Sequence, residues 1–441
     1  MDKKNTLIGV AFLAAAIAAF IYGAKTAPRP VAPSPAPTQT VAPAEGTAPT
    51  PAPEGTVSAP PASAPVPVLT SATPSSTFAA VAREDRSARV VTLGNEFIEA
   101  RFTDLGGAIQ DVAFKKYPAV KGQPEPFVFN AAHADPMLAF TQESFPGLGR
   151  TTRYEVVSQD SSKVVFRAIW ENRVEVTRTY SILPAGSPTD KADPYQLRHE
   201  ISFRNLTDQT VALPRFALSL GTAAPVRADD HGQYLSTGYN TGSDIDFVKR
   251  SDLEASPILS MIGIGSPTPL PVIETPSQIV WGSVENQFFA AILTTDQPGR
   301  GLTTRRVELP PFPGSPVPAI GITGAVSIET AALAPRAESK LGFDFYTGPK
   351  EYSRLSNGDI FKHDQDKVMQ YQWPFSFFSQ LLVSIMATIH GWGVTWGWSI
   401  VLTTLFLKIV FLPLTLSASK SAKRMQKIQP EMQAMREKYK D

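Results

Sequence analysis

Two blocks of apolar residues stand out along the chain, and the first occupies residues 7–24. It contains no charged residue and follows Lys3 and Lys4. As an α-helix it would be about 27 Å long, close to the thickness of a bilayer's hydrocarbon core. The block is longer than the usual core of a signal peptide, and no A-x-A cleavage site follows it directly. The pattern predicts an uncleaved transmembrane signal anchor at 7–24. A cleaved signal peptide and a buried soluble helix are the alternatives.

The second apolar block covers residues 375–416 and is too long for one span. Because tryptophans favour the headgroup level of a bilayer, we divide the block at the tryptophan cluster between residues 392 and 398. Residues 396–416 then have the length of one transmembrane helix. Residues 375–392 predict an amphipathic helix in the membrane interface, since a polar residue recurs at every fourth position. These positions are Ser376, Gln380, Ser384 and Thr388. A second full span is the alternative.

The predicted span at 396–416 contains one charged residue, Lys408. A lysine at the centre of a membrane helix costs roughly 2.5–3.5 kcal/mol on insertion scales, so such residues usually face a cavity or a partner. At 100° per residue, Gly397, Thr404, Lys408 and Thr415 fall within about 40° of one another. This small, polar and basic face predicts a hydrated groove in which Lys408 attracts acidic residues of a translocating peptide. A snorkelling lysine without a function is the alternative.

The composition becomes strongly basic beyond residue 416. Basic residues next to a span mark the cytoplasmic side, so residues 417–441 and 1–6 are predicted to be cytoplasmic and the part between the two spans to be exported. The candidate basic residues are Lys420, Lys423, Arg424 and Lys427. Apolar residues from Met425 to Tyr439 follow a 3-4-3-4 spacing, which is typical of a helix that pairs with another helix. Such a helix, kinked or restarted near Pro430, could also contact anionic headgroups or ribosomal RNA.

The exported part begins with residues 25–80, which are rich in Pro, Ala, Ser and Thr. This composition cannot bury a core and predicts a partly extended tether. Residues 81–355 show many short runs with a period of two, and residues 356–374 connect them to the second apolar block. In one such run Val174, Val176, Tyr180 and Ile182 alternate with polar residues. The pattern indicates an antiparallel sandwich or barrel, and its length suits one large β-sandwich.

Glycine and proline mark the turns of this β-domain. The pair Gly106-Gly107 and Asn205 are turn signals between predicted strands. Proline clusters at Pro267–Pro271 and Pro310–Pro318 are expected in surface loops, because proline cannot occupy a central strand.

The charge of the whole chain is nearly balanced, with 41 Lys and Arg against 40 Asp and Glu. This balance excludes a generally basic nucleic-acid binder and an acidic disordered chain. The chain contains no cysteine, which excludes disulfides, thiol nucleophiles and cysteine-bound metals. His199 lies on an apolar alternating face and is expected in the core, hydrogen-bonded. The run Asp229–His231 has no second cluster to complete a metal site. No catalytic motif is present, so neither an active site nor a cofactor is predicted.

Several motifs resemble a known family. The strings Trp396–Ile400, Phe406–Lys408 and Pro413–Thr415, followed by a basic helix through Pro430, resemble the second span and first cytoplasmic helix of the YidC/Oxa family. This is a family of bacterial membrane protein insertases. The exported part resembles the family's Gram-negative periplasmic domain over four stretches. These are Val91–Tyr117, Val174–Ile182, Trp281–Ala290 and Tyr346–Lys350.

The resemblance implies a multi-pass protein of the inner membrane that is not an enzyme. Its periplasmic domain would be the β-supersandwich shared with sugar mutarotases, without evident mutarotase activity. The implied mechanism is insertion and folding of weakly hydrophobic spans, alone or beside the Sec translocon, without a nucleotide cofactor. The implied partners are nascent membrane proteins, the Sec translocon, the ribosome and anionic lipids. Lys408 occupies the position of the family's groove arginine, and it keeps the charge but not the planar fork.

The family's insertase core has five spans, and this sequence contains one of them. We expect the sequence to be a fragment, with a truncated gene product as the alternative. Two functions of other classes stay open. The first is a membrane-anchored periplasmic scaffold or binding protein without insertase activity, and the second is a carbohydrate-modifying or carbohydrate-binding protein.

Overall fold

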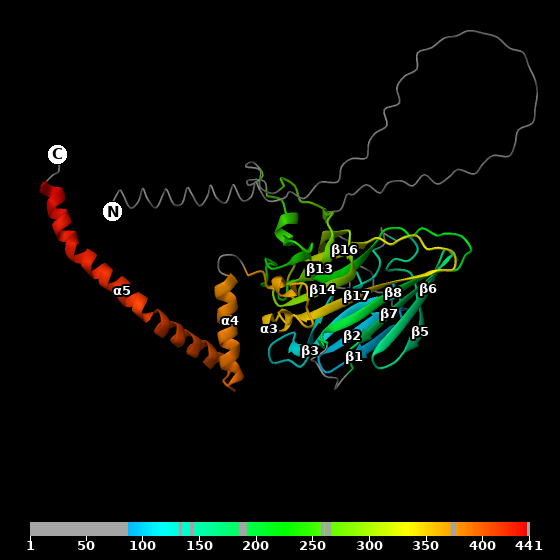
Figure 1. The fold of residues 1–441 in the computed structure, drawn as a ribbon, viewed down its shortest axis with the longest axis horizontal. Coiled ribbons are helices and arrows are strands. Elements are labelled where there is room, and N and C mark those ends of the chain that lie inside the picture. Colours follow the sequence, from blue (N-terminus) through cyan, green and yellow to red (C-terminus); the bar gives the residue numbers. More distant parts are fainter. Residues whose placement is uncertain are drawn as a thin grey trace, which may run out of the picture. The chain divides into compact units, whose positions relative to one another are not determined.

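The computed structural model describes residues 87–131, 135–141, 145–184, 192–256, 260, 266–371 and 376–438. The predicted anchor at 7–24 and the predicted tether at 25–80 lie outside these residues. The chain divides into two units, of which the first ends at Pro349 and the second begins at Lys350. Figure 1 shows mainly strands in the described part of the first unit, which also contains the 3₁₀ turn η1 (Arg250–Leu253), and helices in the second.

The strands of the first unit form three sheets, and the neighbours in each sheet pair antiparallel. A four-stranded sheet has the order β1 (Val90–Gly94), β2 (Ile98–Thr103), β3 (Ala108–Pro118), β4 (Pro126–Phe129). A nine-stranded sheet has the order β11 (Ile245–Lys249), β10 (Ser236–Asn240), β13 (Ile279–Glu285), β14 (Phe289–Gly299), β17 (Glu338–Pro349), β8 (Gln196–Asn205), β7 (Val174–Ile182), β6 (Lys163–Trp170), β5 (Glu155–Gln159). A second four-stranded sheet has the order β12 (Val272–Thr275), β15 (Gly301–Leu309), β16 (Ala319–Ile328), β9 (Phe216–Ala223). The predicted large antiparallel β-sandwich is confirmed.

The alternation seen in the sequence explains how these strands bury one face. In β7 every second residue from Val174 to Ile182 is buried, and the residues between them are partly exposed. The neighbouring strand β8 buries Leu197, Ile201 and Phe203 in the same way. Since successive side chains of a strand point to opposite faces, this period places one row of each strand in the core. The run beginning at Val174 was therefore predicted correctly.

The core also contains Arg178, which lies in the apolar row of β7 and was not predicted. The side chain is fully buried. Its Nη1 donates to the carbonyl oxygen of Gly106 at 2.7 Å, and its Nη2 donates to the carbonyl oxygen of Leu138. The guanidinium carbon lies 4.7 Å from the centroid of the Phe140 ring. No carboxylate among the described residues forms an ion pair with Arg178, so carbonyl dipoles and an aromatic face surround this buried charge.

His199 lies beside Arg178 and is fully buried, as predicted. Its Nε2 is 3.3 Å from Nη2 of Arg178, and its Nδ1 is 3.1 Å from the carbonyl oxygen of Thr179. Burial lowers the pKa of His199 well below its ordinary value, and the charge of Arg178 lowers it further. Because the imidazole is neutral, Nδ1–H donates to Thr179 and Nε2 accepts from Arg178. Its ring stacks on Tyr180 with the centroids 4.2 Å apart.

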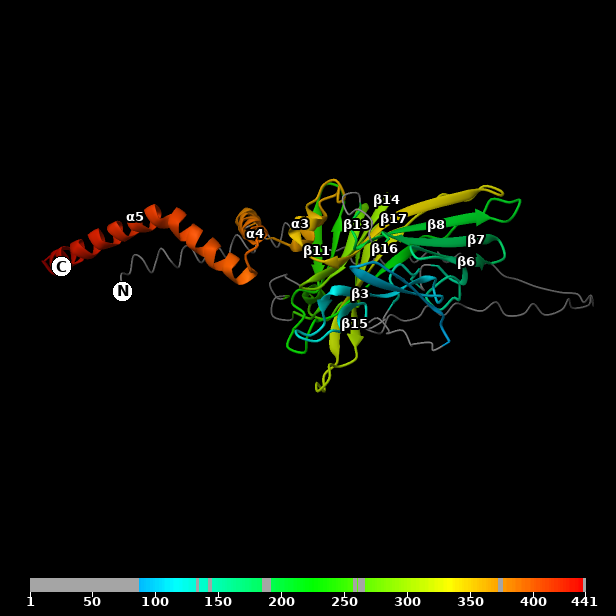
Figure 2. The ribbon, with the colours of Figure 1, turned by 90° about the horizontal axis from the view of Figure 1, so that it is seen from below.

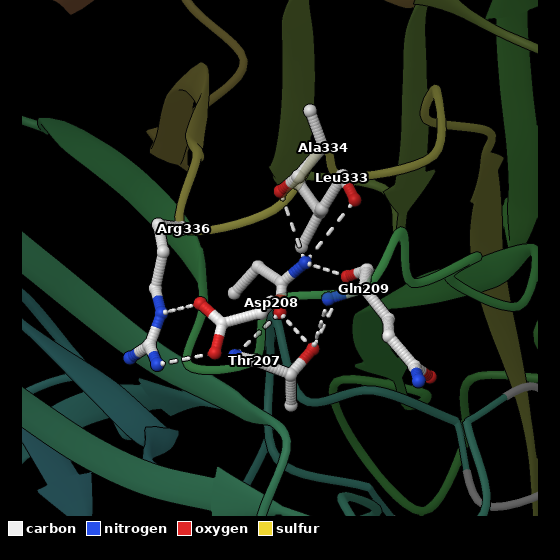
Figure 3. Close-up of polar contacts among 7 residues, drawn as sticks. Thr207, Asp208, Gln209, Leu333, Ala334 and Arg336 are labelled. Atoms are coloured by element: carbon white, nitrogen blue, oxygen red, sulfur yellow. Dashed lines mark hydrogen bonds and ion pairs between the residues drawn. The ribbon is translucent and has the colours of Figure 1, made fainter.

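Asn205 ends β8 and joins two loops that are distant in the sequence. The two N–H groups of its side-chain amide are shared among the carbonyl oxygens of Gln209, Leu333 and Ala334, at N···O distances of 2.7, 3.2 and 2.9 Å. Its Oδ1 accepts from the backbone N–H of Thr207 at 2.9 Å. Figure 3 shows these loops together, with an outer ion pair in which Arg336 donates to Asp208. Asn205 thus fixes the turn after β8 as well as marking it in the sequence.

The β15–β16 hairpin carries the loop Pro310–Pro318 and projects beyond its neighbouring strands (Figure 2). Most residues of this loop are exposed. Pro267 and the following residues up to Pro271 also lie outside strands. Both proline clusters are surface loops, as predicted.

The second unit consists of short and long helices. They are α3 (Tyr352–Leu355), the 3₁₀ turn η2 (Gln365–Met369), α4 (Ser376–Gly391) and α5 (Trp396–Lys438). α5 is continuous through Pro413 and Pro430. The helix is curved in Figures 1 and 2, as expected where proline removes a backbone hydrogen bond. The alternative of a restart near Pro430 is therefore wrong.

Candidate functional site

The candidate site lies on the first half of α5. The segment Trp396–Pro413 has 18 residues and is the one candidate membrane span found among the described residues. Lys408 is its single charged residue. Apolar side chains around the helix are exposed, including Ile400, Leu405 and Ile409. A helix that exposes apolar residues on most sides is suited to an apolar solvent.

A short turn joins α4 to α5 and is fixed by His390. Its Nδ1 lies 2.7 Å from the carbonyl oxygen of Val394, and its ring stacks on Trp396 with the centroids 4.0 Å apart. Gly393 has a φ of 85°, which is in the left-handed region that glycine adopts without strain. The backbone N–H of Gly393 donates to the carbonyl oxygen of His390 at 3.0 Å. These contacts fix the turn and therefore the direction in which α5 continues from α4.

Two different faces of α5 carry its small polar residues. Ser399 and Thr403 are buried on the face where α4 packs, and Ile389 of α4 is buried with them. Gly397, Thr404, Lys408 and Thr415 are exposed. At 100° per residue, the centre of this exposed set lies about 140° around the helix from the α4 contact. α4 therefore leaves the predicted groove face uncovered.

The hydroxyl groups on the groove face already use their hydrogens within the helix. Thr404 Oγ1 donates to the carbonyl oxygen of Ile400 at 2.8 Å, and Thr415 Oγ1 donates to that of Phe411 at 2.9 Å. Their oxygen lone pairs are still able to accept hydrogen bonds. Among the described residues, no carboxylate forms an ion pair with Lys408. The face thus offers one ammonium group and two hydroxyl acceptors to a polar ligand.

The predicted polar stripe of α4 lies away from α5. Ser384 and Thr388 are exposed, and Gln380 is half-buried. The stripe is centred about 160° around the helix from Ile389, which is buried. Phe377 and Phe378 are exposed near the start of the helix. The side chain of Ser376 lies outside the described residues.

The basic second half of α5 exposes both charge and apolar surface. Lys420 and Lys423 are exposed. The side chains of Arg424 and Lys427 are not among the side chains that the structure describes. Tyr439, the last residue of the 3-4-3-4 spacing, lies outside the described residues, whereas the other four apolar residues are also exposed. They are Met425, Ile428, Met432 and Met435.

The β-domain offers no comparable chemistry in the part that the structure describes. No group of three His, Asp or Glu side chains there could hold a metal ion. His231 is exposed on a loop, and its carbonyl oxygen accepts from Arg250. The buried pair of Arg178 and His199 is enclosed in the core. Because neither side chain reaches solvent, we interpret this pair as structural.

Two family models match the chain. A model described as "YidC periplasmic domain" matches residues 90–385, and one described as "60Kd inner membrane protein" matches residues 387–441. A membrane protein insertase YidC of Geobacter sp. (strain M21) is 26% identical over 361 residues, which cover 80% of this chain and 61% of that protein. The membrane protein insertase YidC of Syntrophobacter fumaroxidans is 40% identical over 96 residues, which cover 22% of this chain and 17% of that protein. The chain thus spans less than two thirds of the relatives that it matches.

Two solved structures are also similar. A YidC insertase crystal structure with its first transmembrane domain resolved has 15% identity and a TM-score of 0.28, covering 82% of this chain and 64% of that one. A galactose mutarotase related enzyme from Lactobacillus acidophilus has 10% identity and a TM-score of 0.38, covering 59% of this chain and 97% of that one. At these scores, the identification of the β-domain as a supersandwich stays a prediction.

Proposed function

The chain belongs to the YidC family, and from that membership we propose that it functions in a membrane protein insertase. The periplasmic-domain model covers most of the chain, and the relatives described above carry the name membrane protein insertase. The proposed substrates are nascent membrane proteins, whose insertion, folding and assembly the protein would assist. The proposed partners are the Sec translocon, the ribosome and anionic lipids, and no cofactor is required.

We place the chain in a Gram-negative inner membrane with both ends cytoplasmic. Residues 7–24 anchor it, residues 25–80 form the tether, and the β-domain lies in the periplasm. α4 lies in the periplasmic interface with its stripe towards water. The opposite face of α4 packs on α5, which supports this arrangement. α5 crosses the membrane from Trp396, and its basic half enters the cytoplasm.

The groove face of α5 is the proposed contact for substrate. One observation carries this proposal: Lys408 is exposed, has no ion-pair partner among the described residues, and lies on the face that α4 leaves open. An ammonium within a span is costly unless water or an opposite charge reaches it. A hydrated groove supplies the water, and an acidic residue of a passing substrate supplies the charge. Thr404 and Thr415 would accept hydrogen bonds from the same segment.

The test is replacement of Lys408 in cells depleted of their own YidC and supplied with the gene's whole reading frame. Lys408→Glu should abolish growth and substrate insertion while the protein still accumulates in the membrane, because the charge on the groove face is reversed. Lys408→Arg should retain activity, since it keeps the charge and adds the planar fork. Normal growth with Lys408→Glu would instead favour a membrane-anchored scaffold that acts through its β-domain.

A further inference from the structure

An aromatic cluster reaches the surface at one end of the β-domain. Phe114 of β3 is fully buried, and its ring centroid lies 4.9 Å from that of Phe289. Phe289 stacks on Phe127 at 4.3 Å and meets Tyr117 edge-on at 5.6 Å. Phe288 follows at 6.5 Å from Phe289. The rings thus form a continuous path from the core outwards, which we name the aromatic end.

The outer side of the aromatic end exposes apolar groups. Phe288 is 49% exposed, and Val120 in the β3–β4 loop is 53% exposed. The turn that presents Phe288 is well fixed, because Asn286 Oδ1 accepts from the backbone N–H groups of Phe288 and Phe289 at 3.0 and 2.9 Å. Phe288 is therefore held outwards on an ordered turn.

Three lysines lie in or just after β3, the strand that contributes Phe114 and Tyr117 to the aromatic end. Lys116 Nζ lies 5.4 Å from the ring centroid of Phe97, and Lys115 Nζ donates to the carbonyl oxygen of Asn95 at 2.9 Å. Lys121 is exposed in the same loop as Val120. In the described part of the chain, none of these three lysines forms an ion pair with a carboxylate. Aromatic rings beside lysines that keep their ammonium groups in water are typical of surfaces at the lipid headgroup level.

The chain leaves the β-domain at this same end. Phe289 pairs with Pro349, the last residue of β17, and the sequence continues from there to α4 and the candidate span. The register of the strands places Ile169 at the opposite end of the sheet. Ile169 pairs with Glu175, Glu175 with Arg204, and Arg204 with Glu338 at the start of β17. The two ends of β17 are roughly 36 Å apart for a strand of 12 residues.

We propose that the aromatic end docks on the headgroup layer of the bilayer that anchors the chain. Phe288 and Val120 would enter the boundary between headgroups and acyl chains, and the lysines would contact lipid phosphates. The proposal rests on the membrane topology given above, and it adds a second contact with lipid, made by the β-domain itself.

Fluorescence quenching by lipids tests the contact. The chain has no cysteine, so a single introduced cysteine can be labelled selectively with a thiol-reactive fluorophore. Val120→Cys is the test site, and Ile169→Cys, at a position that is 55% exposed in the native chain, is the matched control. The full chain is reconstituted in phosphatidylcholine–phosphatidylglycerol vesicles that contain a lipid with a nitroxide on its headgroup. We expect the label at residue 120 to be quenched at least threefold more than the label at residue 169.

Equal quenching at the two sites in chains that float with the vesicles would overturn the docking proposal and leave the topology intact. A chain that does not float with the vesicles would overturn the topology itself. Phe288→Asp in the Val120→Cys background provides a second test, at a side chain that is 49% exposed. It should reduce quenching at residue 120 to the level of residue 169, and unchanged quenching would contradict the role of the aromatic end.

Discussion

Acidification should lower the free energy of unfolding of the β-domain, because His199 takes up a proton in the unfolded chain. The folded state keeps this imidazole neutral, because the side chain is fully buried beside Arg178. In the unfolded chain its pKa returns to about 6.5. Below that pH the unfolded state takes up a proton that the folded state does not bind. Stability attributable to His199 is therefore complete above pH 6.5 and is lost as the pH falls towards the lower pKa of the folded state.

The size of the effect follows from this difference in bound protons. Each pH unit below 6.5 over which the folded state keeps His199 neutral lowers the free energy of unfolding by about 1.4 kcal/mol, so a folded state that stays neutral down to pH 5.0 loses about 2 kcal/mol. For a domain of this size the loss corresponds to roughly 4–8 °C in Tm. His199→Gln removes the titration and keeps an acceptor for Arg178. His231→Gln, at an exposed histidine, is the matched control.

The measurement is thermal unfolding of the β-domain in the detergent-solubilised chain, followed by near-ultraviolet circular dichroism between pH 5 and pH 8. Other groups contribute equally to the native chain and its variants, so the difference between them isolates His199. The curve of Tm against pH for His199→Gln should diverge from the native curve below pH 6.5, whereas the curve for His231→Gln should stay parallel to it. Parallel curves for all three proteins would refute the reasoning, because His199 would then titrate alike in the folded and unfolded states.

Three further predictions follow from single contacts. Gly221→Ala should destabilise the β-domain by about 2–4 kcal/mol in urea unfolding, because φ is 86° and a Cβ would clash with Met137 Cγ. Gly314→Ala, with a φ of 82° and open space, should cost only about 1 kcal/mol, and equal losses would contradict the steric argument. Asn205→Ala should cost about 2–3 kcal/mol, since three carbonyl oxygens lose their donor, while Asp208→Asn in the exposed pair should unfold like the native chain. Ser399→Leu should loosen the packing of α4 on α5, seen as faster hydrogen exchange in α4, whereas Thr404→Leu on the open face should leave that exchange unchanged.

The alternation of apolar and polar residues along the chain was sufficient to predict the β-domain. A hydrophobic period of two residues specifies which face of a strand is buried. It identified the buried row of β7 and the core position of His199. It did not identify Arg178, which interrupts the same row. The groups that accept from Arg178, at Gly106 and Leu138, are 72 and 40 residues away in the sequence. Only the folded chain brings these carbonyl oxygens together, so a local pattern carries no signal for them.

The helical unit shows a similar limit. Periodicity placed Gly397, Thr404, Lys408 and Thr415 on one face of a helix, and the structure shows all four exposed on α5. It could not show which face α4 covers, since that depends on the turn fixed by His390. At Pro430 the sequence left a kink and a restart of the helix open, and only the restart is wrong. A long helix tolerates the loss of one hydrogen bond by bending, so the residue is compatible with the continuous helix observed.

Site-specific photocrosslinking from the two sides of α5 tests the central claim most directly. A photoreactive residue replaces Thr404 on the groove face or Phe406, which lies about 160° around the helix and is also exposed. A nascent single-span protein with an acidic N-terminal segment is the substrate, and the gene's whole reading frame is expressed. Crosslinks from position 404 and their absence from position 406 are the predicted result. Equal crosslinking from both positions, or crosslinking from position 406 alone, would contradict a substrate groove on the Lys408 face.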